Sequence, residues 1–239
     1  GLGVAYSILT CAGITYWLFF AIATYFPFSP SIAFLFTLLS YSFFVGPYIG
    51  GASAGACVLM RSPNPWLPRI GVPALWVAAE FARTSLFSGF SWELLGYTQY
   101  RHLELIQLAD LTGVYGLSFL MAFSSYVAME VMLLFPIWRS LRGPSFRGWQ
   151  TFPWQAFGVL GFALLLTFAY GVSRLRLYAP PPNPSVAPLS VAVVRSAVPE
   201  PQRWNRMFYA STLPQYISVT RRSVMRTQPD LVIWPEFAV

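Results

Sequence analysis

Residues 31–59 read SIAFLFTLLSYSFFVGPYIGGASAGACVL and contain no charged side chain. A helix that crosses the hydrocarbon core of a bilayer needs about 20 apolar residues, so this stretch is long enough to span it. Pro47 predicts a kink inside the span, where neighbouring helices compensate for the lost backbone hydrogen bond. Since no residue from Gly1 to Met60 is charged, we identify the chain as a membrane protein.

The composition excludes other classes of protein. The 239-residue chain is 56% hydrophobic and only 10% charged, whereas an ordinary soluble domain carries about 25% charged residues. The same apolar content excludes intrinsic disorder, and two cysteines are too few for a disulfide scaffold. Cys11 and Cys57 lie in apolar segments and are expected to be small buried side chains. His102 is the only histidine, so no metal site is expected.

Four further apolar segments are long enough to be spans. They are residues 2–23, 71–88, 112–135 and 152–172. With residues 31–59 they predict a polytopic α-helical membrane bundle of about five spans over residues 1–172. The loops at 60–70 and 136–151 contain arginine and no acid, which places both on the cytoplasmic side. The fifth span then ends outside the cytoplasm.

The composition changes after residue 172. Residues 173–239 hold 8 Arg and 3 acidic residues (net +5), against 7 Arg and 5 acidic residues (net +2) before them. Residues 173–188 are a proline-rich, extended linker. Residues 189–239 begin an extracytoplasmic α/β domain, with strands expected at 189–195 and 230–234 and an imperfect helix at 205–227.

Two groups of residues are candidates for a function. Glu80 and Arg83 are three apart in a span, so they share a helix face, can pair, and either orient the helix or bind a polar headgroup. The aromatic segment 89–100 follows, and it is either a simple interfacial belt or an arm that positions lipid. Glu236 follows the second strand, where open α/β sheets bind ligands; a solvated loop residue is the other interpretation.

Several motifs in this order resemble the apolipoprotein N-acyltransferase family, bacterial inner-membrane enzymes that add the third acyl chain to lipoproteins. The family's catalytic domain is of the carbon–nitrogen hydrolase (nitrilase) type, so the resemblance implies an αββα sandwich from residue 189 onward. The motifs are Ala74-Leu75-Trp76, Glu80-Phe81-x-Arg83, Gly89-Phe90-Ser91-Trp92, Gly96-Tyr97-Thr98-Gln99 and Leu231-Val232-Ile233-Trp234-Pro235-Glu236.

The resemblance implies a mechanism and a set of partners. Glu236 would be the general base, and a phospholipid acyl chain would pass through a Cys thioester to the amine of an apolipoprotein's diacylglyceryl-cysteine. Lipid would contact Trp92, Tyr97, Gln99 and Trp204, together with Glu80 and Arg83. Membrane lipid and the two lipid-anchored substrates are the implied partners, and no cofactor or nucleic acid is expected. The site would face the periplasm from the inner membrane.

The chain also departs from the family pattern. Ser91 stands where the family usually has Pro, and Arg195-Ser196-Ala197 replaces its Gln-Gly-Asn or Gln-Gly-Asp. The chain contains no lysine, and both cysteines lie in expected spans, so the family's catalytic Lys and Cys are missing. We therefore expect a fragment, cut at both ends and inactive alone.

Two other interpretations remain open. A membrane-anchored amidase of the same superfamily would not need the aromatic segment, so replacing Trp92 and Tyr97 would leave its activity intact. A non-enzymatic membrane protein, such as a transporter, would depend on Glu80 and not on Glu236. The acyl donor, the chain preference and the oligomeric state do not follow from the sequence.

Overall fold

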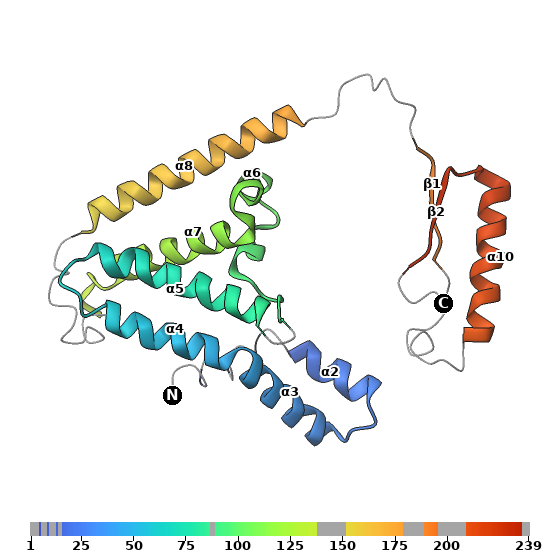
Figure 1. The fold of residues 1–239 in the computed structure, drawn as a ribbon, viewed down its shortest axis with the longest axis horizontal. Helices are drawn as coiled ribbons and strands as arrows, with labels where there is room; N and C mark the ends of the chain where they lie inside the picture. The colour runs from blue at the N-terminus through green and yellow to red at the C-terminus, as the bar shows by residue number, and fades with distance from the viewer. Residues whose placement is uncertain are drawn as a thin grey trace. The chain divides into compact units, whose positions relative to one another are not determined.

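A computed structural model describes residues 16–86, 89–137, 152–178, 189–195 and 209–235, together with the isolated residues 5, 9 and 13. The chain divides into two compact units, residues 1–179 and 180–239, which are described separately (Figure 1). The described elements of the first unit are α2 (Tyr16–Tyr25), α3 (Pro30–Phe44), α4 (Gly46–Leu59), α5 (Trp66–Ser85), η1 (Leu95–Gln99), α6 (Leu103–Ile106), α7 (Ala109–Met132) and α8 (Trp154–Leu177). Those of the second unit are β1 (Val191–Val193), α10 (Tyr209–Thr227) and β2 (Leu231–Ile233).

The apolar run at 31–59 forms two helices with a sharp bend between them. Ser29 caps the N-terminus of α3 by accepting a hydrogen bond from the Ile32 amide, and proline follows as the first helical residue. α3 and α4 meet at Val45 and are bent by 43°. Pro47 lies in the first turn of α4, so the predicted kink falls where a proline is tolerated.

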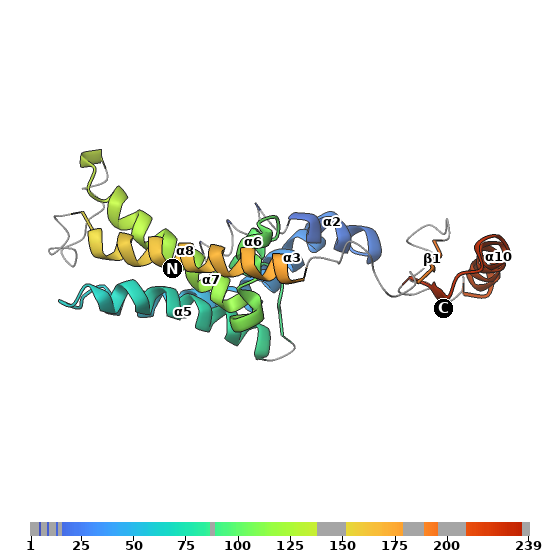
Figure 2. The ribbon, with the colours of Figure 1, turned by 90° about the horizontal axis from the view of Figure 1, so that it is seen from above.

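α5 begins earlier than the sequence predicts. Arg69 and the neighbouring prolines led us to expect a loop at 60–70, yet the helix starts at Trp66 and includes Pro68, Arg69 and Pro73. All three side chains are buried, because α5 packs between α4 and α7 (Figures 1 and 2). Arg69 is therefore not a free loop charge, and Arg61 is the described arginine that remains in that loop.

The last two helices of this unit are long and apolar. α7 and α8 each meet the length and hydropathy of a membrane span, and α3 with α4 form a bent pair that meets them together. α7 contains a break at Gly113, whose positive φ of 63° is non-helical. α8 runs to Leu177, five residues beyond the predicted end of the span. The number of membrane crossings stays a prediction, and the loop at 138–151 lies outside the described residues.

The segment between α5 and α7 is folded tightly onto the helices. It contains the short helices η1 and α6, and η1 packs against α7. Gly96 of η1 makes this approach possible, because a Cβ there would lie 2.6 Å from the carbonyl oxygen of Val114. α6 in turn packs against the C-terminal part of α8, where Gly171 lies directly on the backbone of Glu104.

The second unit has the predicted strand, helix, strand order. β1 and β2 pair in parallel, with Val191 opposite Leu231 and Val193 opposite Ile233. α10 continues through Pro214, and its buried face is centred on Tyr216, which packs with Val194, Val219, Val232 and Trp234. The expected fold class, a helical membrane domain followed by the start of an α/β domain, is confirmed.

Candidate functional site

The face of α5 near its C-terminus carries the two charged residues predicted to pair. Glu80 and Arg83 are 2% and 5% exposed, so both do lie on the protein-facing side of the helix. The prediction of a pair between them is wrong, because neither of the ion pairs among the described residues joins them. Each instead contacts the segment that follows the helix, and helical spacing alone does not indicate that segment.

Glu80 fastens the start of η1. Its Oε1 accepts one hydrogen bond from the Trp76 indole nitrogen at 2.9 Å and another from the Leu95 amide at 2.7 Å. The first bond spans one helical turn and fixes the carboxylate rotamer. The second satisfies a backbone donor at the N-terminal end of η1. Glu80 therefore acts as a cap for η1 from a neighbouring helix.

Arg83 holds the turn just before η1. Its guanidinium donates to the carbonyl oxygen of Trp92 at 2.8 Å and to that of Glu93 at 3.4 Å. It also lies over the Phe90 ring, 5.5 Å from the ring centroid. A guanidinium presents several donors in a fixed plane, so one side chain can fix two successive peptide groups. Buried charge is thereby satisfied by backbone rather than by an opposite charge.

Glu93 is fastened from a third helix. Its Oε2 accepts a hydrogen bond of 2.8 Å from the hydroxyl of Tyr41 on α3. On the other side of η1, the Gly96 amide donates to Ser118 Oγ of α7 at 2.9 Å. Contacts from α3, α5 and α7 therefore converge on residues 92–96 and hold this segment in one conformation.

The side chains predicted to contact lipid point outward from this segment. Trp92 and Tyr97 are 50% and 48% exposed, and Gln99 is half-buried with its amide donating to Thr98 Oγ1 at 3.0 Å. The Trp92 ring is tilted against Trp17 of α2, with 5.1 Å between the ring centroids. The structure thus separates the predicted residues into exposed aromatic side chains and buried charges that hold their backbone.

The sequence analysis missed a buried ion pair at the opposite half of α5. Arg69 Nε lies 2.9 Å from Glu130 Oε1 of α7, and both side chains are buried. Glu130 is the only acidic residue in the segment predicted as the span 112–135. An ionisable residue in a span indicates a partner, so this signal was present and pointed to an unidentified cation.

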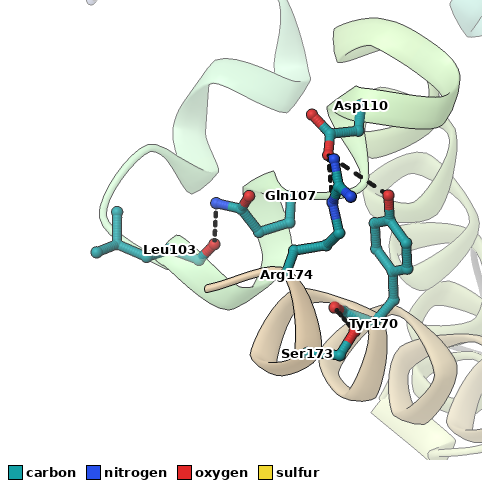
Figure 3. A network of polar contacts seen from close by, with 6 residues as sticks. All are labelled: Leu103, Gln107, Asp110, Tyr170, Ser173 and Arg174. Carbon is teal, nitrogen blue, oxygen red and sulfur yellow. Dashed lines mark hydrogen bonds and ion pairs between the residues drawn. The ribbon is translucent and has the colours of Figure 1, made fainter. Parts of the chain in front are cut away.

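An exposed ion pair connects the end of α8 to the start of α7 (Figure 3). Arg174 lies 2.7 Å from Asp110 Oδ2, and the Tyr170 hydroxyl also reaches that oxygen at 3.4 Å. Tyr178 covers the other side of the guanidinium, 4.5 Å from its ring centroid. The end of α8 therefore lies at the same end of the helical unit as α6 and the 89–99 segment.

Other predicted residues have different outcomes. Glu236 and Trp204 lie outside the described residues, although β2 and the following Trp234 and Pro235 are described. Trp234 is held by a 2.9 Å hydrogen bond from its indole to Thr220. Cys57 is exposed rather than buried, because a face of α4 that points to lipid needs no protein cover. No group of three His, Cys, Asp or Glu among the described residues could hold a metal ion.

These features define the class of protein. The first unit is a membrane domain of apolar helices, one end of which carries a rigid aromatic segment held by buried charges. The family model for the apolipoprotein N-acyltransferase N-terminal domain matches residues 1–127. The chain belongs to the apolipoprotein N-acyltransferase family, as its motifs predicted.

Curated relatives agree with this assignment. The apolipoprotein N-acyltransferase of Geobacter metallireducens is 34% identical over 244 residues, covering 99% of this chain and 42% of that protein. That of Methylococcus capsulatus is 28% identical over 192 residues, covering 80% of this chain and 32% of the relative. That of Azotobacter vinelandii is 34% identical over 183 residues, covering 76% and 31%. The chain therefore spans less than half the length of these relatives.

Proposed function

We propose that the full-length protein transfers an acyl chain from a membrane phospholipid to the N-terminal amine of a diacylglyceryl-cysteine on an apolipoprotein. The proposal is supported by the family and by the rigid aromatic segment at 89–99. This segment exposes Trp92 and Tyr97 while its backbone is held by Glu80 and Arg83. Indole and phenol rings favour the headgroup level of a bilayer, so such a surface suits a lipid substrate.

The first half-reaction forms an acyl-enzyme. Glu236 takes the proton from a cysteine thiol, and the thiolate attacks the carbonyl carbon of a phospholipid ester. The ester C–O bond breaks, a thioester forms, and the lysophospholipid oxygen takes up the proton. A lysine would stabilise the oxyanion of the tetrahedral intermediate. This chain has no lysine, so we assign the Lys and Cys to other parts of the full-length protein.

The second half-reaction releases the enzyme. The α-amine of the apolipoprotein cysteine attacks the thioester, the C–S bond breaks, and an amide forms while the thiol recovers a proton. Both substrates are anchored in lipid by acyl chains. We place the reaction at the periplasmic surface of the bacterial inner membrane, with Glu236 in a nitrilase-like domain that begins at residue 189.

The lipid contact also has an assigned set of residues. Trp92, Tyr97 and Gln99 contact the phospholipid, and Trp204 contacts substrate from the second unit. Glu80 and Arg83 act indirectly, by holding residues 92–95 in place. Their contacts with the backbone support this role better than direct headgroup binding, since both side chains are nearly inaccessible.

The test uses the full-length gene product in proteoliposomes, with a phospholipid labelled in one acyl chain and a diacylglyceryl-cysteinyl peptide. We expect labelled peptide, together with a labelled thioester on the protein that hydroxylamine removes. Glu236→Gln should lower the rate of thioester formation by about 10²–10⁴-fold. The control Glu200→Gln removes a carboxylate from the same unit and should change the rate by no more than about twofold.

Two results would contradict the proposal. Full thioester formation in Glu236→Gln would exclude Glu236 as the base. An unlabelled peptide in the wild-type reaction would exclude the acyl transfer itself. The 239-residue chain alone should form no thioester, and transfer by that chain would overturn the assignment of the Lys and Cys to other parts of the protein.

A further inference from the structure

Glu93 has an unusual backbone conformation for its residue type. Its φ is +61°, in the left-handed region, and it sits in the turn directly after Trp92. A side chain with a Cβ costs roughly 1–2 kcal/mol in that region. Such a conformation persists only where surrounding contacts determine it, so the question is which contacts do.

Two side chains hold Glu93, at different atoms. Arg83 binds its carbonyl oxygen together with that of Trp92. Tyr41, which is 52 residues away in the chain, donates to its carboxylate at 2.8 Å. The other carboxylate oxygen, Oε1, is buried with no hydrogen-bond partner among the described residues. The Tyr41 hydroxyl is thus the described donor that neutral burial of this carboxylate depends on.

Tyr41 connects this turn to the bend between α3 and α4. It is 3% exposed and packs with Val45 and Ile49, which lie on either side of the bend. Its ring meets Phe90 edge to face, with 6.5 Å between centroids, and Phe90 in turn contacts Trp92 at 5.6 Å. Tyr41 therefore reaches Trp92 by two routes, one through the Glu93 carboxylate and one through Phe90.

We propose that Tyr41 and Glu93 form a positioning pair that fixes the orientation of the Trp92 indole for contact with a phospholipid. The lipid contact rests on the proposed function, whereas the positioning of Trp92 stands on the geometry alone. Neither residue touches substrate, so neither is catalytic. Loss of the Tyr41 hydroxyl should release the strained turn and leave Trp92 in more than one orientation.

The experiment uses the chain labelled with fluorotryptophan in lipid nanodiscs and observed by fluorine NMR. The Trp92 resonance is assigned from its loss in Trp92→Phe. In the wild type we expect one sharp Trp92 resonance, broadened by a phospholipid that carries a spin label on its headgroup. Tyr41→Phe should shift or split that resonance and reduce the broadening by at least about half, because the hydrogen bond that fixes the turn is gone.

Matched variants separate positioning from general damage. Tyr48→Phe removes a hydroxyl from α4 that makes no hydrogen bond among the described residues, and it should leave the Trp92 resonance unchanged. Glu93→Gln keeps an acceptor oxygen for Tyr41 and should retain the wild-type resonance. Glu93→Gly suits the positive φ but removes the carboxylate, so it should match Tyr41→Phe. The double variant Tyr41→Phe/Glu93→Gly should be no worse than either single variant.

Activity of the full-length protein gives a second readout. Tyr41→Phe should raise the KM for phospholipid by about tenfold with little change in kcat, since the loss corresponds to roughly one hydrogen bond. An unchanged Trp92 resonance in Tyr41→Phe would overturn the positioning pair. A wild-type Trp92 resonance that spin-labelled lipid does not broaden would instead overturn the lipid contact in the proposed function, and a shift in Tyr41→Phe would still support the pair.

Discussion

The Arg69 guanidinium of α5 lies against the Glu130 carboxylate of α7, with Nε 2.9 Å from Oε1 and 3.1 Å from Oε2. The two side chains are 10% and 3% exposed, so the pair is closed off from its surroundings. Trp66 covers the guanidinium on the α5 side, 5.3 Å from the ring centroid to Cζ. The pair joins two helices that no loop directly connects.

Removal of one partner should destabilise the helical unit strongly. We expect Glu130→Ala to lower the free energy of unfolding by about 3–5 kcal/mol, because it leaves Arg69 buried without a counter-charge. The double variant Arg69→Met/Glu130→Leu should lose much less, since it buries no charge. Unfolding in detergent micelles measures both. Glu104→Ala is the control, and an effect as large as that of Glu130→Ala would refute the special role of the pair.

The role of Arg83 is tested by the mobility of the segment it holds. Arg83→Gln loses the planar fork that binds the Trp92 and Glu93 carbonyl oxygens. Amide hydrogen exchange over residues 92–96 should rise by about tenfold or more, equivalent to roughly 1.4 kcal/mol. Arg101→Gln removes an exposed arginine that donates only to the adjacent Tyr100 ring hydroxyl in the described structure, and exchange there should stay at the wild-type level.

The Asp110–Arg174 pair should behave as a surface ion pair. The side chains are 42% and 27% exposed, so solvent screens the attraction. We expect Arg174→Gln to lower the free energy of unfolding by no more than about 1 kcal/mol. The difference from wild type should shrink further between about 0.01 M and 1 M salt. A salt-independent loss of several kcal/mol would show that packing against Tyr170 and Tyr178, and not charge, holds α8.

Close approach of η1 to α7 predicts a strict requirement for glycine at position 96. An added Cβ would lie 2.6 Å from the Val114 carbonyl oxygen, which is backbone and cannot move aside alone. Gly96→Ala should therefore destabilise the unit by about 1–3 kcal/mol. Gly51→Ala, in α4, meets no atom within 4 Å and should be neutral or stabilising. Thermal unfolding of the two variants side by side measures the difference.

Sequence patterns predicted the helices well where charge was absent and less well where charge was buried. The runs that became α3, α4, α7 and α8 are apolar on all sides, so their identity did not depend on what packs against them. The start of α5 was missed because Arg69 and Pro68 are typical of a loop. Only the neighbouring helix, with Glu130, makes burial of Arg69 favourable.

The candidate site shows the same division. Helical spacing correctly placed Glu80 and Arg83 on one face of α5, because that follows from the period of the helix. Their partners could not be predicted, since they are backbone groups of a segment whose path is set by Gly96 and by the positive φ of Glu93. Tyr41 was missed for a related reason: nothing in an apolar span distinguishes a tyrosine that holds a carboxylate from one that only packs.

α5 is fastened near both of its ends. Arg69 binds α7 in one half, and Glu80 and Arg83 bind the 92–95 segment in the other, about 21 Å further along at 1.5 Å per residue. A slip of one turn, about 5.4 Å, would break all of these contacts together. α5 therefore works as a ruler of fixed length. In a bilayer that is thinner or thicker than this distance requires, the bundle must adapt by tilting or by deforming the surrounding lipid, and it cannot adapt by sliding this helix.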